Sequence, residues 1–284
     1  MKKSTLLLGA LVMPVAAWGR GGRRPANTEE PQFVNEVVLK TTPVKDQGRS
    51  PLCWAYAMLA TIETEHLMVG DSVNLSPDYP ARMFLREQAQ RYFLTGGAQR
   101  VSLRGMSSML LRLTESYGTL AYDAYHNLQG VDYDVLARKA QMTARASASL
   151  GQMNGRLDDF LDREVGFMPR YVFMLGAEYT PLEFGHSVCR PGEYLQLTSF
   201  THHPFGREFV LEVPDNQLRD RFLNVPLDTL MGIMVRALRT GHPVCWEGDI
   251  SEPGFDFRQG VAVLQHKDRV ADQQHRQQSF EARR

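Results

Sequence analysis

Cys53 lies where the sequence pattern predicts the start of a helix. Ser50 is a residue type that caps helices, and Pro51 favours the first helical position, so Cys53 is expected in the first turn. The unpaired N–H groups and the positive end of the helix dipole at that place favour a thiolate, the nucleophilic form of cysteine. The alternative is a buried, inert cysteine in an amphipathic helix. The residues around Cys53 favour the nucleophile.

Gln47 precedes Cys53 by six residues, and the glycine that follows it, Gly48, predicts a turn. Such a turn can return the Gln47 amide toward the start of the helix. Its N–H and the backbone N–H of Cys53 would then donate to an oxyanion that forms on an attacked carbonyl. The pair predicts acyl transfer, with Cys53 as the nucleophile and Gln47 as a donor to the oxyanion.

The elements that must position these residues change type along the chain. Apolar residues recur at helical spacing before residue 167, and short β-branched or aromatic runs dominate after residue 171. This order indicates an α+β fold with a helical lobe, residues 33–190, and a β lobe, residues 191–284. The expected helices are Cys53–Met68, Pro77–Leu94, Gly105–Tyr117, Tyr133–Leu150, Leu157–Val165 and Leu227–Arg239. The expected strands are Tyr171–Leu175, Tyr194–Ser199, Glu208–Val213, Pro243–Glu247 and Val261–Leu264.

Residues 1–19 have the composition of a secretory signal peptide. Lys2 and Lys3 precede an apolar run that is too short for a comfortable bilayer span, and small residues precede a cleavage site after Gly19. Residues 20–32 then form a polar linker. We therefore expect a secreted or periplasmic protein without a membrane span in its mature form.

Charge and cysteine content exclude several classes of protein. The chain has 32 Lys plus Arg and 32 Asp plus Glu, which argues against a general nucleic-acid binder. Glu183, His186 and Cys189 have the loose spacing of metal ligands, but no second ligand pair accompanies them, so neither a metal nor a cofactor is expected. Cys189 and Cys245 either form a disulfide in an oxidising compartment or remain separate thiols.

The segment Pro43–Gly48, followed by Cys53–Ala57, resembles the active-site segment of papain-family cysteine peptidases. The resemblance implies a papain-like two-lobe fold, a peptide substrate, Cys53 as the nucleophile and Gln47 as the oxyanion donor. It also implies that Glu63, on the same helix, is a structural acid. Two positions depart from the pattern: many relatives have a disulfide cysteine where this chain has Ser50, and a glycine where it has Pro51.

Later segments are similar to the bleomycin hydrolase and aminopeptidase C branch of that family. Leu197–Phe205 and Phe209–Asn216 carry the resemblance most clearly, supported by Tyr171–Phe173 and Glu178–Pro181. The branch implies an aminopeptidase that needs no cofactor and often assembles as a homo-oligomer. It also implies that the helical region between about Asp132 and Gly166 is an insertion.

The general base is harder to place. Papain-like enzymes have a catalytic histidine about 130–150 residues after the cysteine, and an asparagine follows it. That interval contains His186, His202 and His203, and His242 opens an expected strand. The resemblance marks the His202-His203 segment as structural and places the His242 strand before the catalytic histidine.

No asparagine follows Asn224, and the chain ends in a charged, Gln-rich stretch. We therefore expect a chain truncated before both the catalytic histidine and the catalytic asparagine, and the family resemblance then implies that the β lobe, residues 191–284, is a partial β lobe. The alternative is a non-catalytic protein, either a pseudo-enzyme or a peptide-binding fragment. Of the remaining histidines, His66 is expected in a helix and His126 in a loop. His266 and His275 are expected in the polar tail.

Overall fold

The computed structural model describes residues 34–48, 50–127, 130–174, 176–248, 255–256, 258 and 260–262. The chain divides into two compact units, Met1–Glu36 and Val37–Arg284, and all elements below belong to the second. The expected signal peptide, the whole of the expected linker and the tail after residue 262 lie outside the described residues. In the described part of the chain, no helix is both long enough and apolar enough to cross a bilayer.

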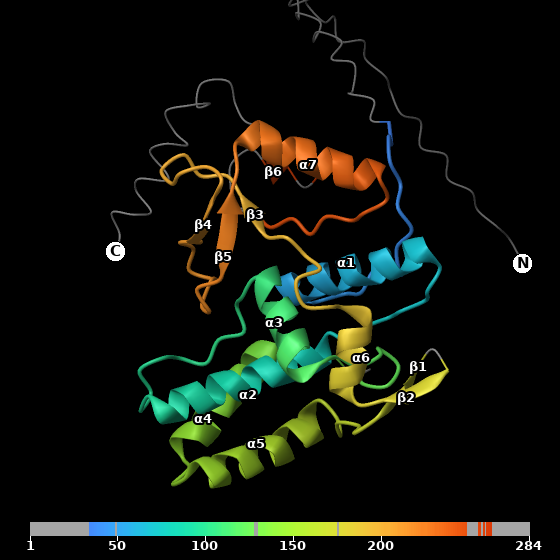
Figure 1. Ribbon diagram of the computed structural model, residues 1–284. Helices are drawn as coiled ribbons and strands as arrows, with labels where there is room; N and C mark the ends of the chain where they lie inside the picture. Colours follow the sequence, from blue (N-terminus) through green and yellow to red (C-terminus); the bar gives the residue numbers. More distant parts are fainter. Residues whose placement is uncertain are drawn as a thin grey trace, which may run out of the picture. The chain divides into compact units, whose positions relative to one another are not determined.

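The described elements are helices in the first half and mostly short strands in the second (Figure 1). The helices are α1 (Cys53–Val69), α2 (Asp78–Leu94), α3 (Ser107–Tyr117), α4 (Tyr133–Arg145), α5 (Leu150–Glu164), α6 (Pro181–Val188) and α7 (Leu227–Arg239). The strands are β1 (Val172–Met174), β2 (Ala177–Tyr179), β3 (Leu197–Thr198), β4 (Arg207–Val210), β5 (Arg221–Asn224), β6 (Phe255–Asp256) and β7 (Val261–Ala262). The expected α+β class is thus confirmed.

The helical pattern located α1, α2, α3 and α7 close to their expected bounds. The expectation of one helix over Tyr133–Leu150 is wrong, because α4 ends at Arg145 and α5 begins at Leu150. The Ser149 hydroxyl accepts a hydrogen bond from the Gln152 N–H, so this side chain caps a new helix. The helical period alone did not reveal that break.

The three-stranded sheet has the order β3-β5-β4. β5 pairs in parallel with β3 and antiparallel with β4, and Asn224 at its end is fully buried. Sequence reasoning missed β5. It also missed α6, although the Thr180/Glu183 capping box and Pro181 at the first position are recognisable signals for a helix start.

The expected strand Pro243–Glu247 is not a strand in the structure. The segment forms no ladder with another described strand and runs beside α1 after the end of α7 (Figure 1). A β-rich composition becomes a strand only where a partner offers backbone hydrogen bonds. Here side-chain contacts with α1 and α3 hold the segment instead.

The main core lies among the helices. α2 packs against α3, α4 and α5, and α3 also contacts α1 and α6. Fully buried side chains at these contacts include Trp54, Phe84 and Phe184. A smaller core joins Met106 at the start of α3 to Leu211 and Phe222 near the sheet.

Backbone approaches backbone where the end of α3 meets α6. Gly118 has a φ of +80°, and a Cβ on Gly185 would lie 2.4 Å from the Gly118 Cα. No side chain can rotate away to relieve that contact. Glycine at both positions therefore permits the close packing of α3 and α6.

Gly185→Ala is expected to destabilise the fold by about 1–3 kcal/mol or more, because the added methyl overpacks a backbone contact. Gly155→Ala is the matched control, since Gly155 lies within α5 and its Cβ would meet nothing within 4 Å. The control should gain about 0.5–1 kcal/mol from the better helix propensity of alanine. Urea unfolding measures both. Equal stability of the two variants would contradict the close packing of α3 and α6.

Candidate active site

Cys53 is the first residue of α1, and its side chain is exposed. The backbone N–H of Cys53 has no hydrogen-bond acceptor among the described residues. The first N–H groups of a helix lack partners within the helix and carry its positive dipole end. An exposed thiol and a free N–H donor thus occur on one residue, as a nucleophile beside an oxyanion donor requires.

The helix start differs in detail from the expected one. Ser50 does not cap the helix and Pro51 does not begin it, because the N-cap is Leu52 and no side chain caps the end. Leu52 is fully buried, and its carbonyl accepts the N–H groups of Ala55 (2.9 Å) and Tyr56 (3.1 Å). Burial of the leucine, rather than a polar cap, therefore sets the position of Cys53.

A buried carboxylate ties the segment before Cys53 to α1. Glu63 is fully buried on α1 and accepts hydrogen bonds from the Thr42 hydroxyl and the Lys45 ammonium. The backbone N–H of Leu75 also donates to Glu63 at 2.6 Å. These contacts give Glu63 the structural role that the family resemblance implies, and they hold residues 42–45 against the helix.

Gln47 lies in the turn between this anchored segment and the helix. The Gly48 N–H donates to the Asp46 carboxylate at 2.7 Å, and the Ser50 N–H donates to the Gln47 carbonyl at 3.2 Å. Gly48 has a φ of +57°, which glycine adopts without strain. The partly buried Gln47 side chain makes no hydrogen bond with Cys53 or with another described residue. Its amide therefore remains available as a donor.

The residue after the nucleophile fixes the orientation of the helix. Trp54 is buried, donates from Nε1 to the Leu103 carbonyl at 2.9 Å, and meets Phe84 edge-to-face at 5.8 Å. A Cβ on Gly105 would lie 3.2 Å from the Trp54 ring and nearer still to the Met109 methyl. Because Trp54 is buried, the face of α1 that carries Trp54 points toward the core. The neighbouring Cys53 lies on another face and stays exposed.

The segment after α7 follows α1 toward its N-terminal half. His242 Nδ1 lies 3.1 Å from Glu65, and the Cys245 thiol contacts the hydroxyls of Thr61 and Ser107. Burial raises the pKa of Cys245 to about 11. From His242 to Cys245 the neighbours on α1 change from Glu65 to Thr61. The chain after residue 242 therefore approaches the end of α1 that carries Cys53.

Glu247 continues this path to the start of α3. Its carboxylate accepts the Ser107 N–H at 2.7 Å, where a helix N-terminus favours negative charge. Burial nevertheless raises the pKa of Glu247, and the bond from Ser107 acts in the opposite direction. The contact ties the chain before residue 248 to α3.

None of the histidines that the structure describes hydrogen-bonds the Cys53 thiol. Each has polar neighbours elsewhere, and His266 and His275 lie outside the described residues. His66 lies beside the Val188 carbonyl and Asp71, and His126 lies beside Asp78 and Tyr122. His186 lies beside the Glu115 carbonyl, His202 and His203 beside Glu212, and His242 beside Glu65.

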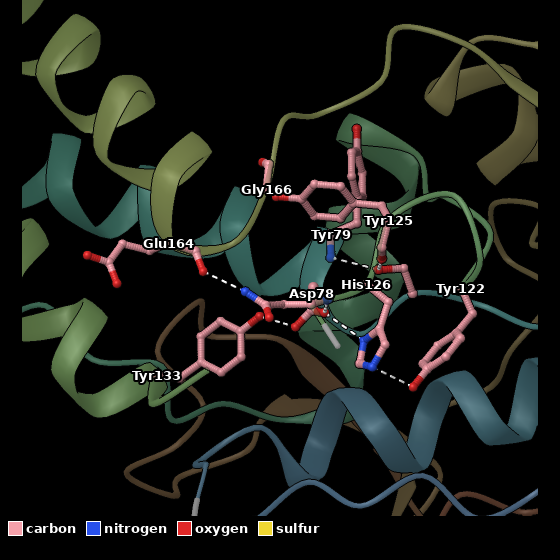
Figure 2. Close-up of polar contacts among 10 residues, drawn as sticks. Asp78, Tyr79, Tyr122, Tyr125, His126, Tyr133, Glu164 and Gly166 are labelled. Atoms are coloured by element: carbon pink, nitrogen blue, oxygen red, sulfur yellow. Dashed lines mark hydrogen bonds and ion pairs between the residues drawn. The ribbon is translucent and has the colours of Figure 1, made fainter. Parts of the chain in front are cut away.

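A second polar network, which sequence reasoning missed, surrounds Asp78 at the start of α2 (Figure 2). The buried carboxylate accepts hydrogen bonds from the Tyr133 hydroxyl, from His126 Nδ1 at 2.9 Å and from the Asn127 N–H at 3.0 Å. His126 Nε2 lies 2.6 Å from the Tyr122 hydroxyl, and burial raises the pKa of Tyr133 well above its usual value.

This network connects to the Glu63 anchor through Lys45. The Lys45 ammonium lies 5.3 Å from the centre of the Tyr122 ring while it pairs with Glu63. The hydrogen-bond donors to the Asp78 carboxylate come from α4 and from the loop after Ala121. The network therefore joins α2 to those two elements. We assign it a structural role in holding the segment before Gln47.

The loosely spaced metal-ligand types on α6 do not converge. The Glu183 carboxylate accepts the Thr180 N–H and hydroxyl, which lower its pKa, and His186 contacts the Glu115 carbonyl. Cys189 is buried, and burial raises its pKa to about 12. Cys53, Cys189 and Cys245 are all free thiols, so of the two alternatives for Cys189 and Cys245 the structure contains the separate thiols.

No family model and no curated protein matches the sequence. The fold is similar to that of solved structures, among them PepW from Lactobacillus rhamnosis HN001 (DR20), with a TM-score of 0.55 and 16% sequence identity. The similarity covers 74% of this chain and 59% of PepW, so the chain spans about three-fifths of the length of that protein. At this identity the likeness shows a shared mixed α+β fold.

Proposed function

We propose that the chain is a papain-like cysteine peptidase of the bleomycin hydrolase branch, and that the complete enzyme is an aminopeptidase. The observation that carries the proposal is the exposed Cys53 thiol at the first position of α1, six residues after Gln47 in an anchored turn. The fold likeness supports it, because PepW is a Lactobacillus aminopeptidase of the bleomycin hydrolase family.

In the proposed reaction the Cys53 thiolate attacks the carbonyl carbon of a peptide bond. A C–S bond forms, and the oxyanion accepts hydrogen bonds from the Cys53 N–H and the Gln47 amide. The C–N bond then breaks as an imidazolium protonates the leaving amine, and water hydrolyses the thioester. Because every described histidine has its polar neighbours elsewhere, we propose that the base lies outside the described residues.

Two further proposals follow from the sequence. Residues 1–19 direct the protein to a secreted or periplasmic location, as their basic start and apolar run indicate. The homo-oligomer that the family resemblance implies is likewise proposed for the complete protein.

A non-catalytic protein is the second candidate function. It is favoured by one observation, namely that no described histidine contacts Cys53. A thiol without a neighbouring base retains little catalytic rate. In this case the chain would bind peptides without cleaving them.

Alkylation by an epoxide inhibitor of cysteine peptidases tests the proposal. At pH 7 the inhibitor should label Cys53 faster in the folded chain than in urea, and Cys53→Ala should remove that label. Cys189 and Cys245 are internal controls, because their raised pKa values, about 12 and about 11, keep both thiols protonated and unreactive at this pH. Peptide mass spectrometry identifies each labelled site.

Labelling of Cys53 no faster in the folded chain than in urea would favour the non-catalytic function. Where labelling is fast, fluorogenic aminoacyl amides with free and with acetylated α-amino groups test the exopeptidase proposal. Cleavage restricted to the free amines supports an aminopeptidase, and equal cleavage of both contradicts it.

A further inference from the structure

Two histidines and a carboxylate meet beside the three-stranded sheet. Nitrogen atoms of His202 and His203 and a carboxylate oxygen of Glu212 all lie within 4.8 Å of one another. Glu212 Oε2 is 3.9 Å from His202 Nε2 and 3.8 Å from His203 Nε2. Consecutive residues in a strand would point to opposite faces, but these histidines lie in a turn, which lets both rings approach one carboxylate.

His203 carries a buried nitrogen that lacks a hydrogen bond. Its Nε2 is inaccessible to solvent and has no hydrogen-bond partner among the described residues, since Glu212 Oε2 lies 3.8 Å away. The ring stacks on Phe209 at 3.9 Å and lies 4.3 Å from the His202 ring. Burial of an unsatisfied polar atom is unfavourable, so a bound group that satisfies Nε2 would stabilise this turn.

The turn is held by an amide from the central strand. Asn224 is fully buried on β5, and its Nδ2 donates to the carbonyls of Phe200 (2.9 Å) and His203 (2.8 Å). Its Oδ1 accepts the Phe200 N–H at 2.8 Å. The backbone that carries both histidines is therefore fixed by the sheet before any ligand binds.

We propose that His202 Nε2, His203 Nε2 and Glu212 Oε2 bind a divalent transition metal ion, with Zn²⁺ as the ion that best fits two imidazoles and one carboxylate. Tetrahedral zinc with bonds of about 2.0–2.2 Å separates its ligand atoms by about 3.3 Å. The three side chains are 26–27% exposed, and their ligand atoms, within 4.8 Å of one another, would have to approach further to bind one ion. Water would fill the fourth position of the bound ion.

The site does not depend on the proposed peptidase function, because neither Cys53 nor Gln47 is among its three ligands. A Zn²⁺ ion there would link the turn after β3 to Glu212, the second residue after β4. Its expected effect is on the stability of the β3-β5-β4 sheet. Sequence reasoning found the two histidines but not Glu212, since only the pairing of β4 with β5 brings the carboxylate to the turn.

The test uses the full chain with the Cys53→Ser substitution, which removes the exposed thiol as a competing ligand. The protein is stripped with a chelator and titrated with ZnCl₂ alone by calorimetry. We expect one site whose affinity falls at least about ten-fold in His203→Ala and in Glu212→Gln. With CoCl₂ as the probe, the absorption spectrum should show four-coordinate cobalt without a thiolate charge-transfer band.

Two matched variants serve as controls. Glu208→Gln removes a carboxylate from β4 that pairs with Arg221, and His186→Ala removes a histidine from α6. Both should bind Zn²⁺ as the parent does. The proposal is overturned if Glu212→Gln binds zinc as tightly as Glu208→Gln, or if ZnCl₂ raises the melting temperature equally in parent and variants. Glu212→Gln decides the question even if His203→Ala fails to fold, because Glu212 is partly exposed.

Discussion

Cys53→Ala in the complete enzyme, which has its catalytic base, is expected to reduce kcat for peptide hydrolysis by a factor on the order of 10⁶, while peptide binding remains. The thiol forms the covalent bond, and water cannot replace it at comparable rate. The measurement is steady-state hydrolysis of a fluorogenic aminoacyl amide by the complete enzyme. Cys245→Ala is the matched control, because this partly buried thiol has a raised pKa and contacts Thr61 and Ser107.

Gln47→Ala should separate the oxyanion role from the nucleophile. Loss of one oxyanion donor costs about 10²–10³ in kcat. Alkylation of Cys53 by iodoacetamide should be nearly unchanged, because that reaction forms no oxyanion. Full activity in Cys53→Ala would contradict the assignment of the nucleophile, and a loss in Gln47→Ala confined to KM would contradict its role as an oxyanion donor.

Glu63→Ala is expected to lower the free energy of unfolding by about 3–5 kcal/mol, the range for breaking a buried ion pair from one side. It leaves the Lys45 ammonium without its carboxylate and the Leu75 N–H without its acceptor. The segment before Gln47 loses its anchor at the same time. Urea unfolding measures the stability.

Glu65→Ala provides the control on the same helix. Glu65 is 28% exposed and pairs with the exposed His242, and such surface pairs contribute about 0–1 kcal/mol. A cycle of Lys45→Met, Glu63→Gln and the double variant measures the coupling of the buried pair. If Glu63→Ala costs no more than Glu65→Ala, Glu63 does not anchor the segment.

The sequence by itself determined the features that depend on neighbouring residues. The spacing of Gln47 and Cys53, the helix that begins at Cys53, and the helical first half followed by strands were predictable because apolar period and turn chemistry act over a few residues. The same reasoning misjudged the cap at Ser50. There the burial of Leu52, a tertiary effect, decided where the helix begins.

Only the tertiary structure decided which distant groups meet. Pro243–Glu247 has strand composition but lies beside α1, because a strand needs a partner that its own sequence does not encode. The Lys45 ammonium donates to Glu63, which is 18 residues later in the chain. Glu212 lies beside His202 and His203, from which it is separated by strand β4. Such contacts depend on long-range packing. Many pairs of charged or polar side chains are chemically equivalent in the sequence, and the packing of the core and the register of the sheet decide which of them meet.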